Sequence, residues 1–136
     1  MNSWLAPSVI AFLCWGLWAF FPKLAVQYIE PKSALVYHAI GAFSVAVVVL
    51  FVLDFKLEFD IRGAGYAFAT GVLGLAGSLA YLYAVAKGPV SLIAILTALY
   101  PVITLVIAYF VLQEPITVKQ AFGVVLAFIA IGLLST

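Results

Sequence analysis

Few side chains in this sequence could do chemistry, and three ionisable groups beside long apolar segments are the main candidates. Each of them has two interpretations. Lys23 either reaches out to a polar interface or faces a wet cavity, because a lysine at the centre of a membrane helix costs about 2.5–3.5 kcal/mol. His38 is the one histidine, and it either caps a helix or takes part in proton coupling, since histidine exchanges protons near neutral pH. Glu114 either solvates a helix end or contacts a ligand.

Aromatic rings and one proline add to these candidates. Trp and Tyr rings can bind organic or cationic solutes through their faces, although an interfacial belt of aromatic residues is the alternative. Pro101 lies inside an apolar segment and frees a backbone carbonyl, which proteins tolerate where the backbone packs on protein or lines water. We therefore expect a solute pathway near residues 97–101, with Glu114 as a structural or gating group. The pathway candidates are Trp15, Trp18, Lys23, Tyr37, His38, Ser78, Tyr81, Thr97, Tyr100 and Pro101.

Catalysis, by contrast, has no basis in the sequence. There is no nucleophile–base pair and no glycine loop of the kind that holds phosphate. The one cysteine, Cys14, cannot form an intrachain disulfide, and the ligands that zinc would need are missing. A net charge of +1 gives no electrostatic reason to expect nucleic acid. We therefore expect no enzymatic activity, no cofactor and no metal.

The composition indicates a lipid environment for these residues. Of the 136 residues, 68% are hydrophobic and 8% are charged, whereas soluble domains carry about 25% charged residues. The longest apolar run, residues 90–112, contains no charged residue and ends before Glu114 and Pro115. As a helix it would be roughly 35 Å long, enough to cross a hydrocarbon core of about 30 Å. Pro115 cannot continue that helix, because proline has no N–H and clashes with the preceding turn.

Four further apolar runs complete the expected fold, an all-α integral membrane protein with five transmembrane helices. Pro22 lies inside the first run as a possible kink, and the polar segment from Asp54 to Arg62 separates the second run from the third. We expect one domain over residues 1–136, with helices at about 4–29, 33–53, 63–86, 90–112 and 116–135. Small residues at spacings that let helices approach closely in lipid are Gly63, Ala67, Gly71, Gly74 and Gly123.

Five spans would leave the two termini on opposite sides of the membrane. Membrane proteins place more Lys and Arg on the cytoplasmic side, and this asymmetry sets their orientation. Here it is absent. One side would hold three basic residues, and the other side would hold the remaining three. Either a weaker signal fixes the orientation, or copies insert both ways (dual topology) and pair antiparallel. The two sets are Lys23, Lys32 and Lys87, and Lys56, Arg62 and Lys119.

Residues 82–134 resemble the second half of an EamA domain of the drug/metabolite transporter superfamily. The matching features are the Gly-Pro-Val-Ser turn at 88–91, Leu-Tyr-Pro at 99–101, Gln-Glu-Pro-Ile-Thr at 113–117, and the glycines at 123 and 132. Trp15, Gly16 and Lys23 resemble the Trp-Gly pair and the basic residue of the family's first helix. The sequence departs from the family where an arginine is usual early in the second helix, since residues 36–38 read Val-Tyr-His.

The resemblance implies a multi-pass protein of the cell (inner) membrane that transports small organic solutes. Family members usually carry two five-helix repeats in inverted orientation, and this chain has one. It therefore implies a homodimer of five-helix halves, antiparallel in the dual-topology case, that works by alternating access. The first helix lacks the carboxylate with which small multidrug-resistance proteins couple transport to protons. The alternative is a non-transporting membrane subunit, or a lipid-carrier flippase component, of a heteromeric complex.

Overall fold

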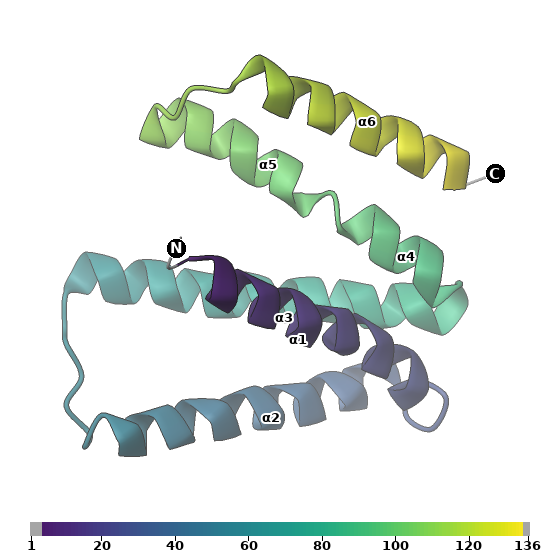
Figure 1. Cartoon of the computed structure of the whole chain (residues 1–136). Helices are drawn as coiled ribbons and strands as arrows, with labels where there is room; N and C mark the ends of the chain where they lie inside the picture. The colour runs from purple at the N-terminus through teal and green to yellow at the C-terminus, as the bar shows by residue number, and fades with distance from the viewer. Residues whose placement is uncertain (1–3, 135–136) are drawn as a thin grey trace. The chain divides into compact units, whose positions relative to one another are not determined.

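The structure is a computed structural model that describes residues 4–134, and Figure 1 shows this part of the chain as helices joined by short segments. No strand occurs within residues 4–134, so the predicted all-α class is confirmed. Helices suit lipid because each satisfies its own backbone hydrogen bonds. The elements are α1 (Leu5–Ala25), α2 (Pro31–Val52), α3 (Ile61–Lys87), α4 (Val90–Thr97), α5 (Tyr100–Ile107), the π-helix η1 (Ala108–Leu112) and α6 (Val118–Leu134).

The helices form two compact units that divide between Lys87 and Gly88. The first unit contains α1, α2 and α3. The second contains α4, α5, η1 and α6. Each unit is described by itself below. The prediction of a single domain over residues 1–136 is not tested by this division and stays a prediction.

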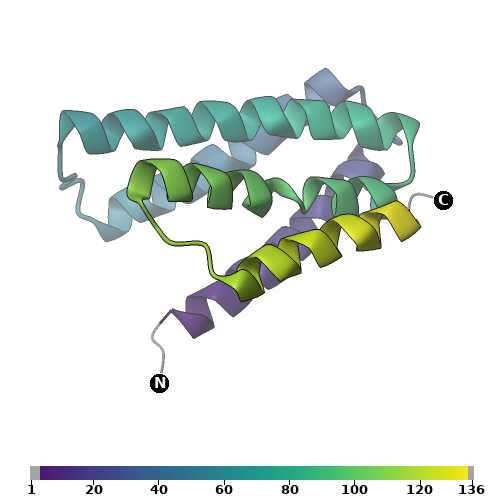
Figure 2. The ribbon, with the colours of Figure 1, turned by 90° about the horizontal axis from the view of Figure 1, so that it is seen from above.

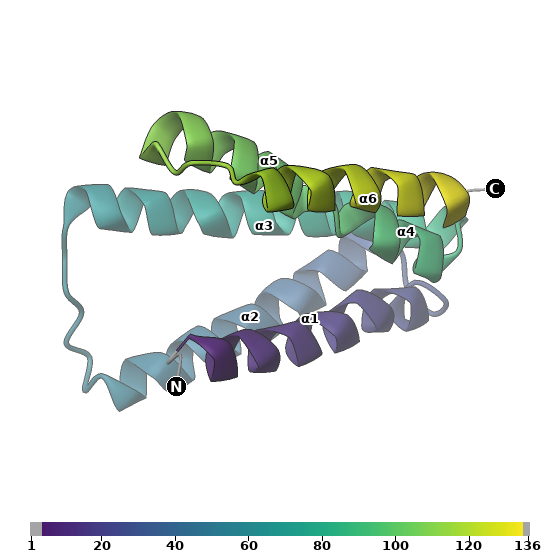
Figure 3. The same ribbon diagram turned by 45° about the horizontal axis from the view of Figure 1, so that its top comes forward.

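The first unit is held together along one face of α3. Ser78, Tyr81, Leu82 and Val85 are buried there, at the spacing that places side chains on one stripe of a helix. Ala34 of α2 is the one other buried residue within residues 4–133. Figure 3 shows that the loop joining α2 to α3 lies at the opposite end of this unit from the turn between α1 and α2. The buried stripe is therefore confined to the end near that turn.

Three helix boundaries in the first unit differ from the sequence prediction by two residues or more, and one of them is the start of α2, at Pro31 rather than at residue 33. The first helix ends at Ala25 rather than near residue 29, because residues 26–28 form a turn in which Gln27 and Tyr28 bond to carbonyls three residues earlier. The third helix begins at Ile61, two residues before the predicted start at Gly63. Asp60 explains this earlier start. Its Oδ1 accepts the backbone N–H groups of Arg62 at 3.0 Å and Gly63 at 2.8 Å, which caps the helix.

The second unit shows that the predicted helix 90–112 is interrupted. The α-helix ends at Thr97 and resumes at Tyr100, with Ala98 and Leu99 between them. Pro101 accounts for the position of this break, because it has no N–H to donate to the carbonyl of Thr97. Leu99 and Val102 instead bond to carbonyls three residues earlier, Leu96 and Leu99, at 3.3 and 2.9 Å. Proline thus produces a break rather than the continuous helix that we expected.

The far end of the same segment widens into the π-helix η1. Its C-cap Gln113 adopts a left-handed conformation with φ 58° and ψ 30°, and the N–H of Glu114 reaches back to the carbonyl of Ala108 at 3.3 Å. The last helix begins at Val118 rather than at residue 116, because Thr117 and Gln120 cap it reciprocally through bonds of 2.8 and 3.3 Å. Figures 1 and 2 show α6 running back in the opposite direction to α5.

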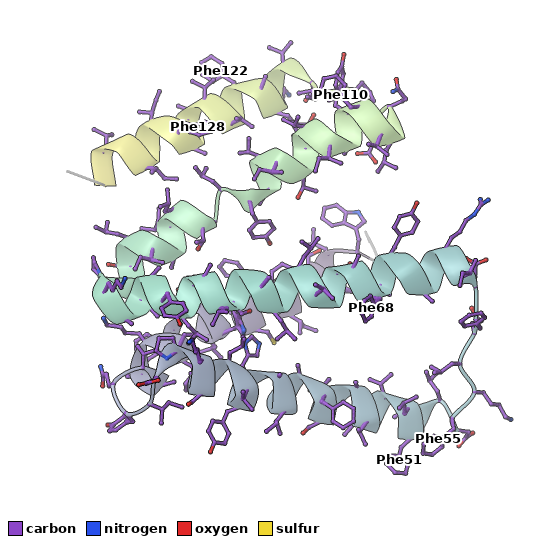
Figure 4. The ribbon with its side chains drawn as sticks, turned by 180° about the vertical axis from the view of Figure 1, so that it is seen from behind. Phe51, Phe55, Phe68, Phe110, Phe122 and Phe128 are labelled. Carbon is purple, nitrogen blue, oxygen red and sulfur yellow. The ribbon has the colours of Figure 1, made fainter. Side chains whose placement is uncertain are left out.

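Within residues 4–134, four helical segments are long and apolar enough to cross a membrane, namely α1, α2, α3 and the segment from Val90 to Leu112. The fifth predicted span, α6, has 17 residues, which corresponds to about 26 Å. Large exposed apolar side chains occur along all of these helices. Figure 4 labels Phe68 of α3 and Phe110 of η1, which are 75% and 68% exposed. Such exposure suits helices whose solvent is lipid. The structure therefore describes a multi-pass membrane protein.

Candidate functional site

Three of the predicted pathway residues meet in the first unit, one from each of its helices. The indole Nε1 of Trp18 donates a hydrogen bond to Nε2 of His38 at 3.3 Å. The Trp18 ring also lies against the Tyr81 ring, with centroids 5.6 Å apart and a tilt of 31°. Because His38 accepts at Nε2, its neutral form must hold its proton on Nδ1. We call Trp18, His38 and Tyr81 the aromatic junction.

Tyr81 of the aromatic junction and Lys23 of α1 each donate a hydrogen bond to the backbone of another helix. The Tyr81 hydroxyl donates to the carbonyl of Ala19 at 2.7 Å, which ties α3 to α1. Lys23 Nζ donates to the carbonyl of Val85 at 2.7 Å. Val85 lies in the last turn of α3, where carbonyls lack helical partners and the helix dipole favours a positive charge. Lys23 therefore stabilises the C-terminal end of α3, whatever else it contacts.

The remaining candidates of the first unit lie apart from these contacts or serve their own helix. Ser78 is buried one turn before Tyr81, and its hydroxyl donates to the carbonyl of Gly74 at 2.7 Å. Trp15 and Tyr37 point outward and are 61% and 67% exposed. An outward position suits the interfacial belt that was the alternative for the aromatic residues.

The second unit contains an open pocket of about 330 Å³. It brings together Tyr100 and Pro101, predicted as pathway residues, with Glu114, predicted as a gating or structural group. Thr97 does not line it; its hydroxyl lies within hydrogen-bond distance of the carbonyls of Ile93 and Ala94 in its own helix. The full lining is Tyr100, Pro101, Thr104, Leu105, Ala108, Glu114, Pro115, Ile116 and Gln120.

The local sequence explains how Glu114 comes to face this pocket. Pro101, Thr104, Leu105 and Ala108 have the spacing of one helix face. The π-helix and the left-handed Gln113 turn the chain so that residues 114–116 contribute to the lining opposite that face. A left-handed conformation is uncommon for a residue other than glycine, and such strain tends to occur at functional sites, as do π-helical turns.

Two polar lining residues, Thr104 and Gln120, were not among the sequence candidates. Thr104 follows Tyr100 by one helical turn, and its hydroxyl lies 3.4 Å from the carbonyl of Tyr100. Gln120 lines the pocket from the start of α6, where its Oε1 accepts bonds from both the N–H and the hydroxyl of Thr117. A signal for Gln120 was present in the sequence, since Thr followed three residues later by Gln is the pattern of a capping box. Thr104 had no such signal.

The predicted helix-packing residues have open surroundings within the described chain. A Cβ added at Gly71, Gly74 or Gly123 would meet no described atom within 4 Å outside its own helix backbone and neighbours. At Gly63 it would meet only the Asp60 side chain, at 3.6 Å. Close packing at these positions, and at Ala67, stays a prediction. As for metals, no three His, Cys, Asp or Glu side chains gather within residues 4–134.

Comparisons with known proteins agree over almost the whole chain. Residues 2–136 match the sequence model of the EamA-like transporter family. An uncharacterized protein of Methanocaldococcus jannaschii is 27% identical over 135 residues, which are 99% of this chain and 98% of that protein. No solved structure matches the chain. The similarity therefore covers both units of the structure.

Proposed function

Because this chain belongs to the EamA-like transporter family, we propose that it carries small organic solutes across the cell (inner) membrane. The family match over residues 2–136 is the observation that carries the proposal. The helices long enough to span a membrane support it, and α6 supplies the fifth span of the proposed arrangement. Members of the family are transporters, so we propose transport rather than enzymatic activity for this chain.

A dimer follows from the number of repeats. Transporters with inverted repeats hold their solute near the membrane midplane, at the interface between the two repeats. The sequence has one repeat, so a second copy in the opposite orientation would supply the other wall of the site. The equal division of basic residues, three on each side, supports insertion in both orientations. Alternating access would then arise from rocking one half against the other.

We propose different roles for the aromatic junction and for the pocket of the second unit. At the aromatic junction, Tyr81 and Lys23 donate hydrogen bonds to backbone carbonyls of α1 and α3, and Trp18 donates one to His38 of α2, so this region joins the first three helices. The pocket of the second unit borders the break between α4 and α5 and is partly open. Interrupted helices are a common feature of solute sites in transporters. We therefore propose that solute contacts the second unit.

Flux into proteoliposomes tests this function. The purified protein would be reconstituted and offered a panel of radiolabelled amines, neutral alcohols, sugars and amino acids. We expect saturable uptake of at least one class, which empty vesicles do not show. Absence of uptake for every class, with a folded dimer present in the vesicles, would refute transport by this chain alone. It would favour the alternative of a membrane subunit or lipid-carrier flippase component of a heteromeric complex.

A further inference from the structure

We infer that the pocket between α5, residues 114–116 and α6 binds a small protonated primary amine. The inference rests on the proposed transport function and specifies its substrate class. Glu114 is the only one of the nine lining residues with a charged side chain. Among the described residues of the second unit, no side chain forms an ion pair or hydrogen bond with the Glu114 carboxylate. An ionised Glu114 carboxylate in the pocket lining attracts a cation and repels an anion.

Hydrogen-bond directions at the pocket also favour an ammonium group. An ionised carboxylate only accepts hydrogen bonds. The Thr104 hydroxyl lies 3.4 Å from the carbonyl of Tyr100, and its oxygen has lone pairs that can accept a hydrogen bond from a ligand. An ammonium group has three N–H donors and no acceptor, which complements both groups. Charge-assisted bonds of this kind are about twice as strong as neutral ones.

Gln120 adds a donor at the α6 side of the pocket. Its Oε1 is already occupied by the N–H and the hydroxyl of Thr117, at 2.8 and 2.9 Å. The amide NH₂ is therefore the part of Gln120 that remains for a ligand, and it can donate to a hydroxyl oxygen. A carboxylate could also accept from this amide, but no lining side chain carries the positive charge that would pair with it. The pocket thus suits an amino alcohol better than an amino acid.

The volume of the pocket is sufficient for a small molecule. A volume of about 330 Å³ lies at the lower end of the range for small-molecule sites, which is about 300–1,000 Å³. Leu105, Pro115 and Ile116 supply apolar lining beside the polar groups, so a short alkyl chain would be accommodated along with the ammonium group.

A set of similar-sized ligands that differ in charge tests the inference by binding rather than by transport. Aminobutanol is the cation, butanediol the neutral analogue, hydroxybutyrate the anion and aminobutyrate the zwitterion. Binding to the purified protein would be measured by isothermal titration calorimetry. We expect aminobutanol to bind most tightly, and Glu114→Gln to weaken its binding by about 10- to 100-fold, the range for a bond to a charged group. Butanediol binding should change little in that variant.

Glu58→Gln is the matched control, because it removes an exposed carboxylate from the loop between α2 and α3 and should leave amine binding unchanged. Equal binding of aminobutanol and butanediol, tighter binding of hydroxybutyrate, or an unchanged affinity in Glu114→Gln would each overturn the inference. If Glu114→Gln does not fold, the four ligands on the unmodified protein decide the question. Uptake of neutral solutes but not amines would refute the amine site and leave transport standing, whereas amine binding without any flux would count against transport alone.

Discussion

Replacing Tyr81 by Phe tests whether the aromatic junction joins α3 to α1. The change removes one hydroxyl, which donates to the carbonyl of Ala19 at 2.7 Å, and keeps the ring that lies against Trp18. Ala19 lies within α1, where its carbonyl also serves the helix, so the substitution leaves no buried acceptor without a partner. A hydrogen bond of this type contributes about 0.5–1.5 kcal/mol in water, and bonds between membrane helices average about 0.6 kcal/mol.

We therefore expect Tyr81→Phe to lower the free energy of unfolding by about 0.5–1 kcal/mol. The measurement is an SDS titration of the purified protein in mixed micelles, followed by circular dichroism. Tyr83→Phe is the matched control on the same helix, because Tyr83 is 38% exposed and faces away from the buried stripe. Equal effects of the two substitutions would refute the role of the Tyr81 hydroxyl. A loss in Tyr81→Phe above about 3 kcal/mol would mean that the hydroxyl supports more than this one bond.

Three further predictions concern the ends of helices and the orientation of the chain. Asp60→Ala removes the cap of α3 and should cost about 1 kcal/mol in the same titration, while Glu58→Ala should stay within about 0.5 kcal/mol of the unmodified protein. Gln113→Gly should be more stable than Gln113→Val by about 1–2 kcal/mol, because valine is strained in a left-handed conformation; equal stabilities would contradict the left-handed turn before Glu114. Two lysines added after Thr136 should shift a protein of dual topology toward one orientation, as read by a C-terminal reporter, and an unmoved reporter would contradict dual topology.

Apolar run length was enough to predict the helices, but the exact helix ends needed local hydrogen bonds. Asp60 caps α3, and Thr117 with Gln120 caps α6, through side-chain hydrogen bonds. Each of these helices therefore begins about two residues away from its predicted start. Pro101 was expected to free a backbone carbonyl inside one continuous helix over residues 90–112, and the structure shows a break there instead. Whether proline kinks or breaks a helix depends on the turn before it, and here Ala98 and Leu99 leave the helix.

The candidate residues could be selected by type from the sequence, but their grouping could not. Trp18, His38 and Tyr81 lie on three helices, and their contact depends on how those helices rotate and cross. Glu114 reaches the pocket only because Gln113 turns left-handed after a π-helix, and no pattern in the sequence predicts either feature. Outward residues such as Trp15 and Tyr37 belong to the same amino-acid types, so type alone could not separate them from the junction.

The central claim is that two copies in opposite orientations make one carrier, and a C-terminal topology reporter tests it most directly. A cysteine added after Thr136, in a Cys14→Ser background, would be labelled in intact and in permeabilised cells with a reagent that does not cross membranes. We predict that a substantial fraction of the cysteine is labelled from outside and that the remainder reacts only after permeabilisation. Labelling of the whole population from one side alone would contradict the antiparallel dimer.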